Sequence, residues 1–129
     1  MVTNLKPIQM KKLITLLFIL AISTQVFAKL KPKHVVGKWK YTVEMDQGER
    51  KGIFKFAEKD GKLTGSIETE DGYAFDFSKV EIKDENTLYF EFTPEYDPIT
   101  ITLKVEGTKF KGTGSSNGGE APVTGEKVE

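Results

Sequence analysis

Apolar and polar side chains alternate with a period of two along most of the chain from residue 35 to residue 128. Trp39, Tyr41 and Val43 are separated by single polar residues, and so are the aliphatic residues between Ile99 and Val105. Successive side chains of a strand point to opposite faces, so this pattern predicts strands with one buried face. No window after residue 28 shows a sustained helical spacing of apolar residues. The pattern therefore predicts an all-β domain.

Turn-forming residues separate the alternating runs. Asp60-Gly61, Asp71-Gly72 and Asn117-Gly118 are pairs that tolerate the positive φ angles of tight hairpin turns. The runs between the turns predict eight strands, at residues 35–45, 49–58, 62–69, 73–82, 87–93, 98–106, 109–115 and 120–128. Every connection is short, and a closed sheet has no exposed edge. We therefore predict an eight-stranded antiparallel up-and-down (meander) β-barrel.

The polar face of the predicted strands separates this chain from outer-membrane barrels. Those barrels present an apolar band to lipid and keep polar groups inside. Here the positions opposite the aromatic residues are charged: Lys38, Lys40, Glu44, Lys55, Glu68, Asp76, Glu81, Glu91, Lys104 and Lys111. This face belongs in water, and the aromatic face belongs inside.

Residues 1–28 have the three parts of a secretory signal peptide. Lys11 and Lys12 precede an apolar run at residues 13–22, and a small-residue exit ends at Ala28. Met10 is the predicted functional start. The apolar run is shorter than the ~20 residues that span a bilayer, although an uncleaved anchor is the alternative. We predict cleavage after Ala28 and a periplasmic or secreted domain at residues 29–129, with no membrane span.

Charge and cysteine content narrow the function classes. The chain has no cysteine, which excludes disulfides, thiolate metal sites and thiol nucleophiles. Its formal net charge is zero, but residues 29–129 hold sixteen basic and all nineteen acidic residues, a charge of −3. Nucleic-acid binding requires a basic face, so no nucleic-acid partner is expected.

Gly37-Lys38-Trp39 opens the first predicted strand, and Lys127 lies in the last one. A G-x-W motif at this place in an eight-stranded meander resembles the calycin superfamily, the lipocalins and their relatives. The resemblance implies a lipocalin-like barrel in which Trp39 closes one end and a basic residue, here Lys127, packs over its ring. That basic residue is more often arginine in the family. The whole domain, with Leu63-x-Gly65 echoed by Phe110-x-Gly112, also resembles small secreted bacterial lipocalin-like domains of mostly unassigned function.

The sequence offers little for catalysis. His34 is the only histidine, so a site with three imidazole ligands is excluded, and it lies in a polar N-terminal stretch where a solvated side chain is expected. No serine lies in a nucleophile-elbow motif, and the paired carboxylates fall at turns, where solvated charges are usual. We predict no catalytic residues, no metal site and no cofactor.

The inward positions of the predicted strands are rich in aromatic rings. They are Tyr41, Phe54, Phe56, Phe75, Phe77, Phe90, Phe92 and Phe110. An eight-stranded barrel encloses packed side chains or one small ligand, so the rings either fill the interior or line a pocket. Gly65, Gly112 and Gly114 share the inward face. Space beside these glycines indicates a pocket, whereas rings covering them indicate a solid barrel.

Arg50, the only arginine, has the inward parity of Phe54 and Phe56 and lies at the predicted mouth of its strand. A guanidinium at this place pairs well with a ligand carboxylate. The alternative is a rim residue whose charged end extends into water.

The sequence thus favours an exported, non-enzymatic binding protein that holds a small apolar or lipid-like ligand in the Phe-lined interior. The predicted ligand contacts are the eight rings and Arg50. The alternative is a solid barrel that serves as a protein-interaction or accessory module for a partner in the cell envelope. The sequence does not name the ligand.

Overall fold

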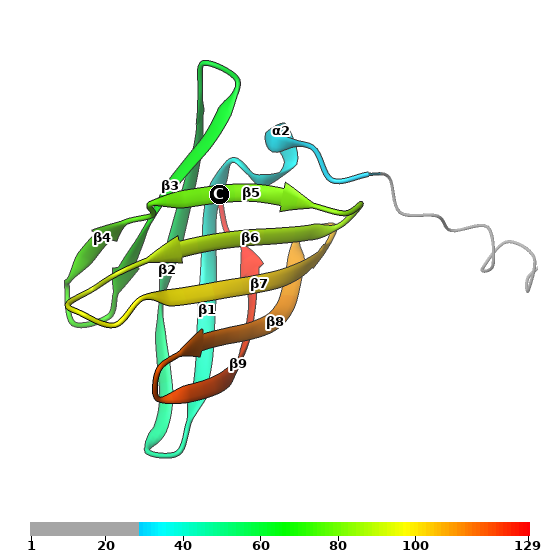
Figure 1. The fold of residues 1–129 in the computed structure, drawn as a ribbon. Helices are drawn as coiled ribbons and strands as arrows, with labels where there is room; N and C mark the ends of the chain where they lie inside the picture. Colours follow the sequence, from blue (N-terminus) through cyan, green and yellow to red (C-terminus); the bar gives the residue numbers. More distant parts are fainter. Residues whose placement is uncertain (1–28) are drawn as a thin grey trace, which may run out of the picture.

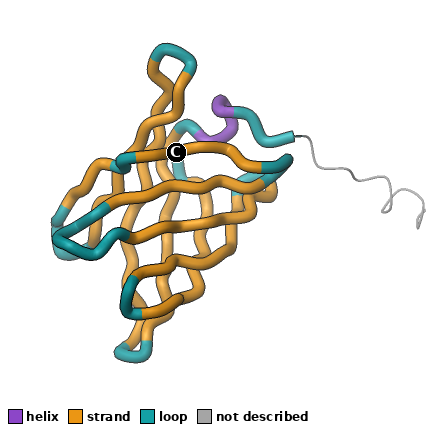
Figure 2. The backbone as a smooth tube through the Cα atoms, in the orientation of Figure 1, coloured by secondary structure: helices purple, strands orange, loops and turns teal. Residues whose placement is uncertain are grey.

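The computed structural model describes residues 29–129 as one curled antiparallel sheet preceded by a short helix (Figures 1 and 2). The predicted signal peptide, residues 1–28, lies outside the described residues. The helix is α2 (Pro32–Val35), and the strands are β1 (Gly37–Met45), β2 (Gly48–Lys59), β3 (Lys62–Thr69), β4 (Ala74–Asp76), β5 (Lys79–Lys83), β6 (Thr87–Phe92), β7 (Ile99–Glu106), β8 (Lys109–Ser116) and β9 (Gly119–Lys127). No helix in this part of the chain is long and apolar enough to cross a membrane.

The sheet is a meander in which each strand pairs with its neighbour in sequence, and β1 also pairs with β9. The strand order is β4-β3-β2-β1-β9-β8-β7-β6-β5. In the β1–β9 ladder, Trp39 lies opposite Lys127 and Val43 lies opposite Val123. Pairing of the first strand with the last bends the sheet into a half-barrel (Figure 1).

The number of strands differs from the sequence prediction. The predicted strand at residues 73–82 is two strands, β4 and β5, separated by Phe77 and Ser78. The chain changes partners at this point: the Phe77 N–H donates to the Gly65 carbonyl of β3 (2.9 Å), and the Ser78 N–H donates to the Glu91 carbonyl of β6 (2.8 Å). The two edge strands are thus consecutive in sequence and are joined by a bend.

The other seven predicted strands lie within two residues of the observed ones. The first strand also starts later than predicted. Residues 35 and 36 precede the strand, because Val35 ends α2 and β1 begins only at Gly37. The helix has four residues, too few to show a helical periodicity in the sequence.

The core lies on the concave side of the sheet, where the alternating apolar positions meet. Its largest fully buried side chains are Trp39, Phe54, Phe90, Leu103, Val35 and Val123. The convex side carries the charged positions, including an ion pair of 2.8 Å between Lys55 of β2 and Glu68 of β3. The sheet therefore has one buried apolar face and one solvent-exposed charged face, as the alternation predicts.

The N-terminal segment covers one end of the curled sheet. Leu30 and Val35 are buried, and the Trp39 indole N–H donates to the Val35 carbonyl (2.8 Å). The Lys127 ammonium lies 5.8 Å from the centre of the Trp39 ring and donates to the His34 carbonyl (3.4 Å). At Gly37 (φ +134°) an added Cβ would meet the Lys127 side chain and the Glu129 carbonyl, so only glycine fits. We call this end the closed end.

Candidate functional site

The predicted ligand-binding rings fall into two groups, and the larger group fills the closed end and the middle of the sheet. Phe90 packs against Phe56 (5.3 Å between ring centres) and Phe77 (4.5 Å), and Phe110 packs against Trp39 (5.6 Å). A Cβ on Gly65 would meet the Phe56 and Phe77 rings, both at 2.9 Å. Rings therefore cover Gly65, and this half of the interior is solid.

Gly112 is covered in a different way. A Cβ at this position would meet the backbone of Thr102 and Leu103 on the adjacent strand β7. Gly114, two residues further along β8, has no close neighbour: its nearest atom would be Val123 Cγ2, at 3.5 Å. Of the three inward glycines, only Gly114 could take a Cβ without a clash, because that atom would make ordinary van der Waals contacts with Val123 and Ile101.

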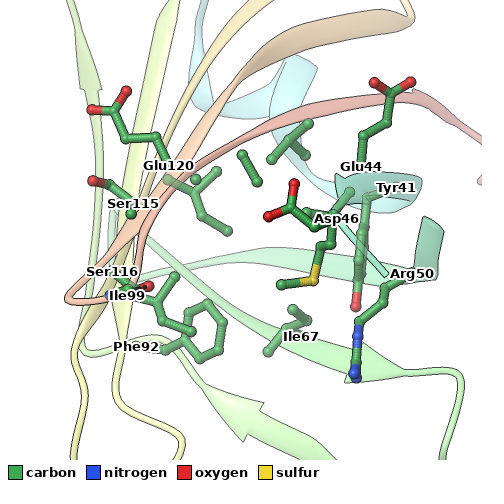
Figure 3. A pocket seen from close by; sticks show the side chains of 18 of the residues that line it. Tyr41, Glu44, Asp46, Arg50, Ile67, Phe92, Ile99, Ser115, Ser116 and Glu120 are labelled. Atoms are coloured by element: carbon green, nitrogen blue, oxygen red, sulfur yellow. Dashed lines mark hydrogen bonds between the residues drawn. The ribbon is translucent and has the colours of Figure 1, made fainter. Parts of the chain in front are cut away.

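A cavity of about 360 Å³ lies at the end of the sheet opposite the closed end (Figure 3). We call this the open end. Its floor is apolar, and its rim comes from the β1–β2 and β8–β9 turns. The lining residues are Tyr41, Val43, Glu44, Met45, Asp46, Arg50, Phe54, Ile67, Phe92, Ile99, Ile101, Gly114, Ser115, Ser116, Gly118, Gly119, Glu120, Ala121 and Val123. Its volume is within the range of small-molecule sites, roughly 300–1,000 Å³.

Strand register places the two rings at the base of the cavity. Tyr41 of β1 lies opposite Gly52 of β2, and its ring covers that glycine, where a Cβ would meet the ring at 2.7 Å. The Tyr41 ring stacks on the Phe54 ring, with 4.4 Å between centres and 15° between planes. Gly52 thus makes room for the stacked pair that separates the cavity from the filled core.

The Tyr41 hydroxyl lies in a strongly acidic environment. Burial, the largest cause, and the negative charges of Glu70 and Asp71 together raise the pKa of Tyr41 to about 12, against a smaller lowering by the positive charge of Arg50. The residue is only 5% exposed, yet no residue between 29 and 129 forms a hydrogen bond with the hydroxyl. The hydroxyl, which lies over Gly52, therefore has no protein partner within the described residues.

Arg50 is exposed and lines the cavity on the same side as Tyr41 (Figure 3). It makes no ion pair within the described part of the chain. Its inward parity at the mouth of β2 agrees with the sequence prediction, and its exposure agrees with a rim position. Pairing of Arg50 with a ligand carboxylate stays a prediction.

The structure brings together four of the nine predicted ligand contacts at the cavity: Tyr41, Arg50, Phe54 and Phe92. Phe56, Phe77, Phe90 and Phe110 pack in the filled core, away from the cavity lining. Phe75 lines a separate cleft with the exposed Tyr73 and Tyr96.

Sequence reasoning missed the aliphatic half of the cavity, which comes from Val43, Ile67, Ile99, Ile101, Ala121 and Val123. Parity alone would have found several of these, because Val43 shares the face of Tyr41 and Ile101 lies opposite Gly114. Among residues 29–129, no group of three or more His, Asp or Glu side chains is arranged to hold a metal ion.

The chain is similar to known proteins in its fold and not in its sequence. No family model matches the chain, and no curated protein matches it in sequence. Solved structures match at low identity. A redesigned β-barrel is 20% identical with a TM-score of 0.63, covering 76% of this chain and 95% of its own. A second redesigned barrel, mFAP1 bound to DFHBI, is 15% identical with a TM-score of 0.57, covering 75% and 97%.

A natural protein has the same fold. The fatty acid binding protein of Schistosoma mansoni, solved in complex with arachidonic acid, is 15% identical with a TM-score of 0.54, and the match covers 78% of this chain and all of that one. Identities this low show the fold alone. The chain therefore has the fold of these β-barrels, and membership of the calycin superfamily, suggested by the G-x-W motif, stays a prediction.

Proposed function

We propose that this chain is an exported, non-enzymatic binding protein that takes a small apolar ligand into the cavity at its open end. The observation that carries the proposal is the cavity itself. It has a floor of stacked rings and aliphatic side chains, a volume of about 360 Å³ and a rim of exposed polar residues such as Asp46 and Glu120. Such a lining excludes water from an apolar ligand while leaving an entry path.

Two structural neighbours support a binding role. One contains arachidonic acid and the other contains DFHBI, so barrels of this shape hold small organic molecules. The cavity here is confined to one end, because rings and backbone cover Gly65 and Gly112. We therefore propose a compact ligand or the end of a chain, held by Tyr41, Phe54, Phe92 and the aliphatic lining. A barrel solid throughout, acting only as an interaction module, would not need the space at Gly114.

Export is part of the proposal. Leu30 is buried, and its N–H donates to the Glu85 carbonyl (2.6 Å). A chain cut after Ala28 therefore retains the whole of the described core. Intact-mass measurement of the exported protein would give the mass of residues 29–129, whereas a mass that includes residues 13–22 would contradict cleavage.

Filling the cavity tests the binding role. Gly114→Leu adds a side chain at a position that lines the cavity and accepts a Cβ, and Thr113→Leu puts the same side chain on the outward face of the same strand. Titration calorimetry with 1-decanol should show one saturable site in the native chain and in Thr113→Leu. Affinity should fall at least about tenfold in Gly114→Leu, because the new side chain occupies the space that the ligand needs.

A second cavity-filling variant keeps the test valid if Gly114→Leu misfolds. Ala121→Leu fills the cavity from β9, opposite Gly114. Thermal unfolding of all variants checks that they fold. The proposal is wrong if 1-decanol shows no saturable binding to the native chain, or if the two filled variants and Thr113→Leu bind it equally well.

A further inference from the structure

We infer that the open end selects ligands whose polar group is positively charged: an apolar body that carries a protonated amine or a quaternary ammonium. This inference rests on the proposed function and adds the charge of the ligand to it. It follows from how the fold distributes carboxylates between the two ends of the sheet.

Four connections meet at the open end, and all of them are acidic. They are the β3–β4 turn, the β6–β7 loop, the β8–β9 turn and the β1–β2 turn, whose hairpin extends away from the β3–β4 and β6–β7 connections (Figure 2). Asn117 joins two of them through a hydrogen bond of 3.0 Å to Asp97. Residues 44–51, 70–73, 93–98 and 116–120 carry eight acidic side chains: Glu44, Asp46, Glu49, Glu70, Asp71, Glu95, Asp97 and Glu120. They carry only two cations, Arg50 and Lys51, which leaves a formal charge of −6.

The closed end has no such excess. Residues 29–36, 58–62, 83–86, 106–109 and 126–129 carry eight basic and seven acidic side chains. The charge of residues 29–129 as a whole is only −3. The negative potential is therefore concentrated where the cavity opens, and a cleft lined by one sign of charge attracts the opposite sign.

None of the eight carboxylates at the open end is neutralised by an ion pair within residues 29–129; the ion pairs there involve Glu68, Glu81 and Glu129. Glu44 lies directly opposite Glu49 in the β1–β2 register. Like charges in opposed positions of a sheet are destabilising. The arrangement therefore does not serve the stability of the hairpin.

The polar groups that reach the cavity are suited to a cation. Figure 3 shows the Asp46 carboxylate pointing toward the cavity and those of Glu44 and Glu120 pointing outward at its rim, and Arg50 is the single basic residue of the lining. The buried Tyr41 lines the cavity without a hydrogen-bond partner within residues 29–129, and its oxygen can accept a bond from an ammonium. That oxygen is uncharged at neutral pH, as in any tyrosine, and the raised pKa of Tyr41 extends its uncharged range to higher pH.

An anionic ligand would bind here only through Arg50. One guanidinium can pair with a carboxylate, but the acidic residues around it outnumber the two cations. At Tyr41, where burial is the largest cause of the raised pKa, the negative charges of Glu70 and Asp71 also raise the pKa by more than the charge of Arg50 lowers it. The Arg50–carboxylate hypothesis and the present inference therefore predict opposite preferences.

Three probes of equal chain length separate these possibilities: 1-decanol, decylamine and decanoate, measured at pH 7 by competition for a single site. At low ionic strength decylamine should bind at least roughly tenfold more tightly than decanoate, with 1-decanol between them. Added salt should reduce the difference in affinity between decylamine and decanoate, because at 0.1 M salt the interactions of exposed charges are screened beyond about 10 Å.

A matched pair of variants locates the effect. The triple variant Glu44→Gln, Asp46→Asn and Glu120→Gln neutralises the cavity rim, and Glu58→Gln, Glu85→Gln and Glu106→Gln makes the same charge change near the closed end. The rim variant should lose most of the preference for decylamine over decanoate, and the closed-end variant should keep it.

Decanoate binding as tightly as decylamine, or equal behaviour of the two triple variants, would overturn the inference while leaving the cavity as a binding site. If 1-decanol and the two charged probes all fail to bind, the proposed function fails and the inference fails with it.

Discussion

Tyr41 joins the packed core to the cavity. Its ring is buried over Gly52 and stacks on Phe54, and its hydroxyl, which also lies over Gly52, is affected by the negative charges of Glu70 and Asp71. Desolvation and negative neighbours both disfavour the phenolate. The folded state therefore holds the Tyr41 proton more tightly than the unfolded chain does.

This difference predicts how stability depends on pH. Between pH 10.0, the usual pKa of tyrosine, and about 12, the unfolded chain has released the proton and the folded chain has retained it. The stabilisation is therefore complete below pH 10.0 and is lost as pH rises through the folded-state pKa. Relative to Tyr41→Phe, the native chain should lose about 1–2 kcal/mol across this range, reduced because solvent reaches the hydroxyl. Denaturant unfolding checks this, and a difference from Tyr41→Phe that does not change with pH would contradict it.

The bend between β4 and β5 joins the two edge strands of the curled sheet. Phe77 bonds to β3 and Ser78 bonds to β6, and the Phe77 ring packs on Gly65. A methyl group at residue 65 would meet Lys55 O at 2.6 Å as well as two rings. Overpacked positions cost about 1–3 kcal/mol, and the bend would have to shift to relieve the clash.

We therefore expect Gly65→Ala to destabilise the domain by about 1–3 kcal/mol. Gly114→Ala is the matched control, since its new methyl would make only ordinary contact with Val123 at 3.5 Å, and surface or open positions change stability by no more than about 0.5 kcal/mol. Urea unfolding compares the two variants. Equal stability of both would mean that the fit of Phe77 against Gly65 does not hold the bend.

Some of these elements could be predicted from the sequence, and others could not. Alternation is a local property of a strand, so the strands from Trp39 to Val43 and from Ile99 to Val105 are readable in the chain. The bend after Asp76 is not readable, because it arises from pairing with β3 and β6, which are far away in sequence. For the same reason parity placed Tyr41, Phe54 and Phe90 inside, but it could not say which of them border a cavity. That depends on which glycine a neighbouring strand or ring covers.

At the scale of the whole molecule, the two ends of the curled sheet differ in both packing and charge. The closed end is sealed by α2, Trp39 and Lys127. The open end has the cavity and an excess of carboxylates. The proposed binding role requires such a difference between the ends, whereas a solid barrel does not, so the position at which a ligand binds tests the proposal.

Amide NMR of the exported chain during a titration with 1-decanol determines that position most directly. We expect saturable chemical-shift changes at the amides of five residues that border the cavity: Val43, Ile99, Ile101, Gly114 and Ser115. The chemical shifts of the Gly37, Gly65 and Gly112 amides, which lie in the filled half, should not change. Absence of saturable changes, or changes concentrated around Gly65 and the closed end, would contradict the proposed binding role of the cavity.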